Sequence, residues 1–380
     1  MSDKKILPPA MLGMLGGGQL GRFFVIAAHE MGYKVTVLDP DQNSPAGKIA
    51  DVHLCAAYDD AVALEKMAQG CEAITTEFEN VPAATLDFLA KSRIVSPAAD
   101  CVAIAQHRVK EKNFIRDAGL PVAPFVVIEQ SSDLPADGHD IYPAILKVAR
   151  FGYDGKGQAR VSNQAQAQAA FEAFKHEVCV LEKMLKLDYE VSVVLARDMD
   201  GQVAAFPTAE NQHLNGILDV SIVPARGSQT VRDQAQALAI KVAGKLNYVG
   251  VLGVEFFVCD GQLLVNEMAP RPHNSGHYTI DACVTNQFEQ QVRAMARLPL
   301  GNPRLHSPAV MVNILGDSWK HGEPAWDKAF ADTSLKLHLY GKHEPRPGRK
   351  MGHFTVIGEN AETVLKEAMQ ARSDLEIGQN

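Results

Sequence analysis

The sequence predicts an α/β segment built on a parallel sheet, followed by an α+β segment rich in hairpins and a small C-terminal part. Strand-like and helix-like patterns alternate over residues 11–99, which is typical of βαβ units. From residue 123 onward strands dominate, with few long helices. A length of 380 residues exceeds the roughly 250–300 residues that one core usually spans. We therefore expect three domains, covering residues 1–106, 107–300 and 301–380.

The first segment is predicted to be Rossmann-like. Its elements are strands at 11–15, 34–38, 52–55, 73–76 and 93–95 and helices at about 19–32, 60–69 and 82–91. Ligands of such sheets bind at the carboxyl ends of the strands, where Asp39 and Glu77 follow two of these strands.

Helical patterns around 100–118 lead into the α+β segment. Its strands are expected at 123–128, 143–149, 178–182, 188–196, 202–207, 218–224, 250–258 and 262–267, with helices at about 163–175 and 230–246. A helix at 286–297 and a stretch with Pro and Gly at 298–308 mark a boundary near 300. Strands at 309–314, 334–340 and 353–357 and a helix at 361–371 complete the chain.

Composition narrows the class of protein. Hydrophobic residues make up 46% and charged residues 22% of the chain, which excludes disordered and fibrous classes. The net charge of −8 gives no overall attraction to nucleic acid or an anionic membrane, so we expect small-molecule partners. Six scattered cysteines favour buried thiols in a reducing compartment, and no apolar run reaches the ~18 residues of a membrane helix. The expected location is cytoplasmic.

A glycine-rich turn follows the first strand. Gly16, Gly18 and Gly21 form a G-x-G-x-x-G pattern, and Asp39 lies near the ~20-residue offset at which a carboxylate binds the ribose of a dinucleotide. An NAD(P)-dependent oxidoreductase is therefore one hypothesis.

A second glycine loop, FGYDGKGQ at 151–158, directly follows the strand that carries Lys147. Glycines let backbone N–H groups turn toward an anion, and Lys147 and Lys156 add positive charge, as phosphate binding requires. A hairpin turn with incidental lysines is the alternative for this loop alone.

Acidic residues also end or interrupt apolar strands. Glu182 ends one strand and Glu190 begins the next, where a backbone edge and a carboxylate could hold adenine and ribose. Glu255 lies inside an apolar run, and Asn266 and Glu267 close another, which suggests ligands for Mg²⁺. A two-residue turn at Asp260 and Gly261 would send Glu255 and Glu267 to opposite faces, so their convergence requires a longer connection or a bulge.

Together these features resemble the ATP-grasp ligases. More closely, six segments resemble the 5-(carboxyamino)imidazole ribonucleotide synthases of purine biosynthesis, in the same order over about residues 11–357. They are GGGQLGR (16–22), TTEFENVP (75–82), FGYDGKGQ (151–158), ENQH (210–213), NEMAPRPHNSGH (266–277) and RPGRKMGH (346–353).

The resemblance implies an ATP-grasp fold with an N-terminal Rossmann-like domain and a small C-terminal domain. It implies a ligase that uses ATP and bicarbonate to form carboxyphosphate, whose CO₂ is captured by the amine of aminoimidazole ribonucleotide. Mg²⁺, with Mn²⁺ as an alternative, and a homodimer also follow from it.

The resemblance further implies the roles of individual residues. The expected ATP contacts are Arg108, Lys147, Gly152, Tyr153, Asp154, Gly155, Lys156, Gly157, Gln158, Glu182, Lys183, Leu185, Glu190, His213, Asn266 and Glu267, with Glu255 and Glu267 as metal ligands. The bicarbonate and carboxyphosphate site would comprise Tyr153, Asp154, Arg271, His273 and Asn274. The ribonucleotide would meet Gly18, Gln19, Leu20, Lys342 and Arg349 with its phosphate and Glu77 with its ribose.

Three other functions stay open at this point. Another ATP-grasp ligase, such as the formate-dependent glycinamide ribonucleotide transformylase or a biotin carboxylase, would share the architecture, but TTEFENVP and YGKHEPRPGRK (340–350) favour the imidazole substrate. An oxidoreductase leaves Lys147 and the Glu255 and Glu267 pair without a purpose. A nucleotide-binding regulator without activity is disfavoured because both acids are present.

Overall fold

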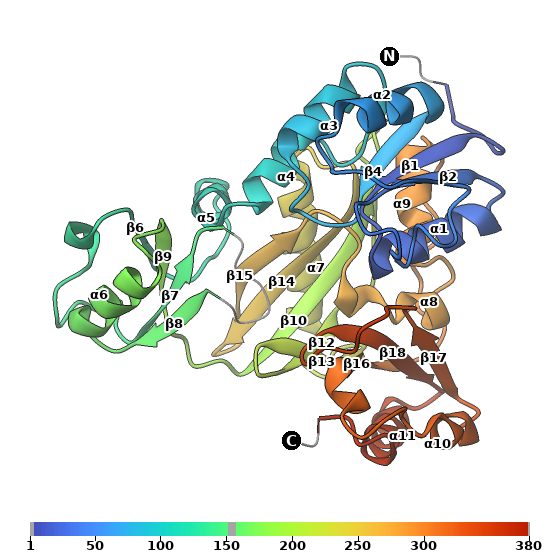
Figure 1. Ribbon diagram of the computed structural model, residues 1–380. Coiled ribbons are helices and arrows are strands. Elements are labelled where there is room, and N and C mark those ends of the chain that lie inside the picture. Colours follow the sequence, from blue (N-terminus) through green and yellow to red (C-terminus); the bar gives the residue numbers. More distant parts are fainter. Residues whose placement is uncertain (1–3, 151–156, 379–380) are drawn as a thin grey trace.

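The computed structural model describes residues 4–150 and 157–378, and their strands form three sheets (Figure 1). Among these residues, no helix combines the length and apolar character that crossing a bilayer demands.

The N-terminal sheet is parallel and has the order β3–β2–β1–β4–β5. Its strands are β1 (Met11–Leu15), β2 (Lys34–Leu38), β3 (Val52–Leu54), β4 (Ala73–Thr76) and β5 (Ile94–Val95), and its helices are α1 (Gln19–Glu30), α2 (Ala61–Gly70) and α3 (Ala83–Ala90). The predicted parallel sheet is confirmed. Because β2 and β4 flank β1, Asp39 and Glu77 lie on either side of the first glycine turn.

The nine-stranded central sheet is antiparallel and has the order β15–β14–β10–β12–β13–β16–β18–β17, with β11 paired to β10. It contains β10 (Tyr189–Arg197), β11 (Val203–Ala205), β12 (Ala209–Leu214), β13 (Ile217–Val223), β14 (Gly250–Cys259), β15 (Gln262–Ala269), β16 (Ala309–Leu315), β17 (Leu335–Leu339) and β18 (Lys350–Ile357). The three C-terminal strands thus extend the sheet of the middle segment. The domain limits at 106 and 300 stay a prediction.

Helices connect and cover the sheets. Val292 and Met295 of α9 (Gln287–Met295) pack against Leu12 and Val35 of the N-terminal sheet, and α9 also contacts β10 and β14. This helix therefore links the two large sheets. Further helices are α7 (Gln229–Lys245), the short α8 (Thr279–Ala282), α10 (Trp326–Ala331) and α11 (Ala361–Asp374). Of these, α10 and α11 pack against the C-terminal strands.

The third sheet, β6–β9–β7–β8, stands to one side of the central sheet together with α6 (Gln164–Ala173) (Figure 1). Its strands are β6 (Phe125–Ile128), β7 (Ala144–Val148), β8 (Gln158–Val161) and β9 (Cys179–Lys183). Lys147 on β7 and Glu182 on β9 point to the same face, because Glu182 pairs with Ile145, two residues before Lys147.

The structure differs from the predicted elements in several respects, and the short helices α8 and α10 were not predicted. The helical region at 100–118 is two helices, α4 (Ala99–Ala105) and α5 (Arg108–Asp117), because His107 is extended and the Gln106 amide donates to the Val81 carbonyl at 2.7 Å. Strands β8 and β12 were not predicted. In β12 the sequence is polar, yet Asn211 is buried and its amide bonds with Ser192 and Ser221 satisfy it.

Candidate functional site

The hairpin of β14 and β15 brings the two predicted metal ligands together. Cys259 pairs with Gln262 across a two-residue turn, in which Asp260 and Gly261 both have positive φ, as a type I′ turn requires. A bulge then leaves Asn266 unpaired, so that Glu255 lies opposite Glu267. The prediction that convergence needs a bulge or a longer connection is confirmed, and the device is the bulge.

The electrostatics of this pair suit a divalent cation. Burial and the neighbouring Glu267 carboxylate raise the pKa of Glu255 to about 8. Nη1 of Arg108 lies 3.5 Å from Oε2 of Glu267. Two close carboxylates repel each other unless a cation or a proton lies between them, and carboxylate oxygens are the ligands that Mg²⁺ prefers.

His273 is fixed in one tautomer beside this pair. The Ser275 backbone N–H donates to its Nδ1 at 3.3 Å, and the Ser275 hydroxyl lies 2.8 Å from the same atom. Burial and Arg271 lower the pKa of His273 well below its ordinary value. The neutral ring therefore carries its proton on Nε2, which faces Oε1 of Glu255 at 3.3 Å. His273 therefore presents its Nε2 proton toward the Glu255 carboxyl group.

Glu182 lies between two lysines. Its Oε1 accepts from Lys147 Nζ at 2.9 Å, and its Oε2 pairs with Lys112 Nζ at 2.6 Å. Burial would raise the pKa of Glu182, but the two ammonium groups lower it to about 2. The Glu182 carboxylate thus holds the predicted phosphate lysine, and contact with adenine would depend on other atoms of the residue.

Two further ATP candidates meet beside a cavity. His213 Nδ1 lies 3.4 Å from Glu190 Oε2, and although burial lowers the pKa of His213, the nearby Glu190 carboxylate raises it overall. Glu190 also borders a cavity of about 590 Å³, which it shares with Tyr189, Glu210 and Arg226. This volume is in the range of small-molecule sites.

The other predicted ATP contacts lie around β7 and β9. Lys183 pairs with Asp140 at 3.8 Å, and Leu185 lies in the connection between β9 and β10. In the second glycine loop the Gly157 carbonyl accepts from Val148 N–H at 2.9 Å, and Gln158 pairs with Lys147. The loop residues Gly152, Tyr153, Asp154, Gly155 and Lys156 lie outside the described residues.

The first glycine turn receives two carboxylates. Glu77 accepts from the N–H groups of Gly18 and, at 2.7 Å, of Gly21, while Asp39 accepts from Gly17 N–H at 2.7 Å and from the Tyr58 hydroxyl. A Cβ on Gly18 would lie 2.6 Å from Glu77 Oε1, so the pattern of glycines allows this close approach. Asp39 therefore has a structural partner, and the Gly18 N–H is already bonded.

Arg271 and Asn274 are held by residues from other elements. Arg271 Nε donates to Glu79 Oε2 at 2.6 Å, which ties the segment after β15 to the loop after β4. Asn274 and Asn313 exchange amide hydrogen bonds of 2.7 and 3.0 Å. Both side chains are thereby oriented before any ligand binds.

The predicted C-terminal contacts meet the first glycine turn. Tyr340 packs with Leu20 and Phe23 of α1, and Lys342 Nζ lies 5.5 Å from the Tyr340 ring and donates to the Lys350 carbonyl at 2.7 Å. Burial raises the pKa of the Glu77 carboxyl group, and the positive charge of Lys342 opposes this rise. Arg349, by contrast, donates to the Glu344 carbonyl at 3.0 Å in an exposed position.

Known proteins share this architecture. Family models match three successive parts: a ribonucleotide synthetase preATP-grasp domain over residues 10–106, an ATP-grasp domain over 113–288 and a phosphoribosylaminoimidazole carboxylase C-terminal domain over 309–367. The N5-carboxyaminoimidazole ribonucleotide synthase of Bacillus subtilis (strain 168) is 44% identical over 369 residues, 97% of this chain and 96% of that protein. This chain belongs to the N5-carboxyaminoimidazole ribonucleotide synthase family.

Solved structures of the synthase family agree. The crystal structure of the ADP complex of an N5-carboxyaminoimidazole ribonucleotide synthetase is 41% identical and superposes with a TM-score of 0.92, covering 99% of this chain and 100% of that one. The Aspergillus clavatus synthase in complex with ADP and 5-aminoimidazole ribonucleotide is 30% identical with a TM-score of 0.89, covering 97% and 98%. The predicted ATP-grasp fold with its N-terminal and C-terminal domains is confirmed.

Sequence reasoning about the synthase motifs missed Lys112 and Glu79. Lys112 follows Arg108 by four residues, which places both on one face of α5, so helical spacing was the available signal. Glu79 lies inside TTEFENVP, but its partner Arg271 is 192 residues away and nothing local indicates the contact.

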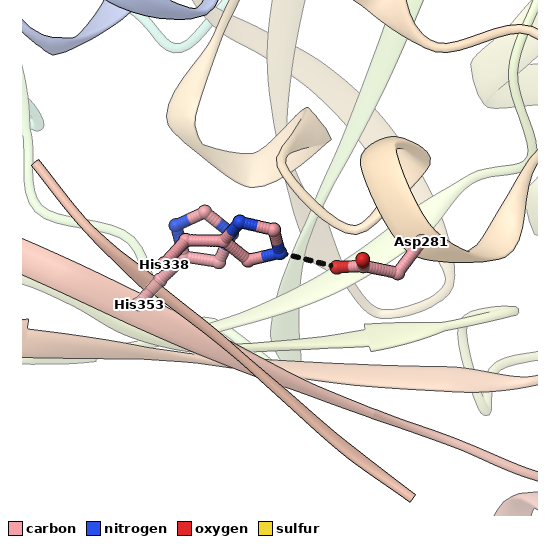
Figure 2. Close-up of side chains that lie close together, drawn as sticks. All are labelled: Asp281, His338 and His353. Atoms are coloured by element: carbon pink, nitrogen blue, oxygen red, sulfur yellow. Dashed lines mark hydrogen bonds and ion pairs between the residues drawn. The ribbon is translucent and has the colours of Figure 1, made fainter.

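A cluster of two histidines and one aspartate contains none of the predicted site residues. Asp281, His338 and His353 have ligand atoms within 4.8 Å of one another (Figure 2). However, His338 Nε2 bonds to Asp281 at 2.8 Å, and the rings of His338 and His353 stack with centroids 4.7 Å apart and planes 21° apart. An ion binds an imidazole nitrogen in the plane of its ring, which two stacked rings cannot share. The arrangement favours hydrogen-bonded packing of the C-terminal strands against α8.

Proposed function

We propose that this protein carboxylates 5-aminoimidazole ribonucleotide to N5-carboxyaminoimidazole ribonucleotide in purine synthesis, using ATP and bicarbonate. The observation that carries the proposal is the bulged hairpin. It sets Glu255 opposite Glu267 directly before the segment with Arg271 and His273, so that groups suited to a metal–phosphate complex adjoin groups suited to a carboxylate. The relative solved with ADP and 5-aminoimidazole ribonucleotide supports the choice of substrate.

On the ATP side, Arg108 and Lys147 bind the phosphates. The second glycine loop is proposed to cover the phosphates, and its residues 152–156 lie outside the described part of the chain. Glu190 and His213 hold the ribose, while Lys183, Leu185 and the backbone near Glu182 meet adenine. Mg²⁺, or Mn²⁺ as an alternative, would be held by Glu255 and Glu267 and would neutralise charge on the phosphates.

In the reaction, an oxygen of bicarbonate attacks the γ-phosphorus, and ADP leaves. The carboxyphosphate then breaks its bond between carbon and the bridging oxygen, giving CO₂ and phosphate. The substrate amine attacks the carbon of CO₂ and loses a proton. Positioning and charge neutralisation are the main requirements for such a transfer.

Arg271 is suited to orient carboxyphosphate, since a guanidinium matches a pair of oxygens and Glu79 holds it in place. His273 contributes the Nε2 proton as a donor, and its Nδ1 is occupied by Ser275. Asn274, Tyr153 and Asp154 complete this part of the site.

On the ribonucleotide side, Lys342 and Arg349 bind the phosphate. Because the Gly18 N–H is bonded to Glu77, the helix-end contacts to phosphate come from Gln19 and Leu20. Each Glu77 oxygen accepts one backbone N–H and has a second lone pair for a ribose hydroxyl.

The proposal extends to a homodimer, as the resemblance implies, and to the cytoplasmic location that the scattered cysteines favour. Light scattering coupled to size-exclusion chromatography tests the homodimer, since a species of twice the chain mass is expected.

The function is tested by measuring ADP release with ATP, bicarbonate and 5-aminoimidazole ribonucleotide, each omitted in turn. We expect turnover only with all three, and one ADP per carboxylated product. Turnover that ignores the imidazole, or that needs formate with glycinamide ribonucleotide, would contradict the proposal.

A further inference from the structure

Lys112 is a buried cation that is not among the residues proposed to contact ATP, the metal or the ribonucleotide. Its side chain is 1% exposed, and it lies on α5 four residues after Arg108. Its Nζ pairs with Glu182 Oε2 at 2.6 Å and donates to the Asn266 carbonyl at 3.0 Å. A buried ammonium is costly unless it is paired, and these two acceptors fix where it lies.

The same helix holds the bulged strand at a second point. Glu111 Oε1 accepts from Met268 N–H at 2.6 Å, so neighbouring residues of α5 bind the backbone on both sides of Glu267. Arg108 approaches the Glu267 carboxylate from the same helix. The position of Lys112 is therefore set by the metal-binding strand as well as by Glu182.

Lys112, Lys147 and Glu182 form a buried cluster, and Lys112 changes the summed charge of this cluster. Lys147 and Glu182 alone would sum to zero, and the carboxylate would compete with a phosphate for the Lys147 ammonium. Lys112 brings the sum to +1 and engages the second oxygen of Glu182. Lys147 is the more exposed lysine, with 10% of its side chain accessible against 1% for Lys112, so the excess charge is presented at Lys147.

We propose that Lys112 is a positioning residue for nucleotide binding: it balances the charge of Glu182, so that Lys112, Glu182 and Lys147 together keep a net positive charge, which Lys147 presents to the ATP phosphates. This inference rests on the proposed function for the identity of the anion. It does not depend on which acceptor is carboxylated.

The test compares Lys112→Met, Lys112→Arg and the double variant Lys112→Met with Glu182→Gln, by calorimetric titration with ATP. Lys112→Met leaves Glu182 to neutralise Lys147, and we expect the Kd for ATP to rise about 10- to 100-fold, the loss of a charged hydrogen bond. The double variant removes one charge of each sign, so that Lys147 is the charged group that remains of the three. It should return to within about threefold of the wild-type Kd, as should Lys112→Arg.

An unchanged Kd in Lys112→Met, or a double variant that binds ATP as weakly as Lys112→Met, would overturn the inference, because damage to packing alone would not be rescued by a second substitution. If Lys112→Met does not fold, the double variant and Lys112→Arg decide: near wild-type affinity in both supports the inference, and a tenfold loss in both refutes it. Wild-type ATP binding without carboxylation would count against the proposed function alone.

Discussion

Glu182 should make the protein sensitive to acid in a defined window. Its pKa is lowered from 4.5 to about 2 by Lys112 and Lys147, which outweigh the effect of burial. A carboxyl group whose pKa is lower in the folded state stabilises that state above its unfolded pKa, and the stabilisation is lost as pH falls toward the folded pKa. The free energy of unfolding should therefore fall as the pH drops from 4.5 to 2.

The size of the effect follows from the shift. Lowering the pKa of Glu182 from 4.5 to about 2 corresponds to about 3 kcal/mol of folding stability in total. About 1 kcal/mol of this stability is already lost at pH 3.5. A loss of 1 kcal/mol lowers the melting temperature of a domain of 150–250 residues by about 2–4 °C.

The assay is thermal unfolding of the wild type and of the Lys112→Met, Glu182→Gln double variant at pH 6, 4.5 and 3.5. Other acidic groups contribute equally to both proteins, so the difference between their pH slopes isolates Glu182. We expect the wild type to lose about 2–4 °C more than the double variant between pH 4.5 and 3.5. Equal losses would refute the description of Glu182 as a carboxylate held between two ammonium groups.

Three further substitutions probe the rest of the site. Glu267→Gln should abolish turnover and weaken Mg²⁺ binding in calorimetry while the melting temperature changes little; retained turnover would remove Glu267 from the metal site. Lys342→Ala should raise the KM for the ribonucleotide about 10- to 100-fold with little change in kcat, since its proposed partner is a phosphate remote from the reacting atoms, and a fall in kcat alone would contradict this role. Gly18→Ala places a Cβ 2.6 Å from Glu77 Oε1 and should lower the melting temperature by several degrees, whereas Gly70→Ala, which meets nothing within 4 Å, is the matched control. Equal melting temperatures of the two glycine variants would argue against the Glu77 contact.

The architecture and the hairpin that sets Glu255 opposite Glu267 could be predicted because their signals are local. Alternating periods predicted the parallel sheet, and Asp260 with Gly261 predicted the turn. The parity of strand side chains then required a bulge or a longer connection, and the structure has a bulge at Asn266. Each of these inferences depends on residues within a few positions of one another.

Contacts between distant segments could not be predicted in this way. In the structure the glycines of the first turn make room for the carboxylates of Glu77 and Asp39, and the predicted phosphate cradle did not include this contact. Glycines permit any close approach, so their pattern does not identify the approaching group. Likewise, Lys112 meets Glu182 and Asn266 only through tertiary packing, 70 and 154 residues along the chain.

In the proposed reaction, bicarbonate is activated by direct transfer of the γ-phosphoryl group of ATP. The most direct test uses ¹⁸O-labelled bicarbonate in unlabelled water, with ATP and 5-aminoimidazole ribonucleotide, and analyses the released phosphate by ³¹P NMR. If carboxyphosphate forms, one bicarbonate oxygen remains on phosphorus, and each phosphate should carry one ¹⁸O atom in proportion to the enrichment of the bicarbonate. Carboxylated product accompanied by unlabelled phosphate would contradict the account.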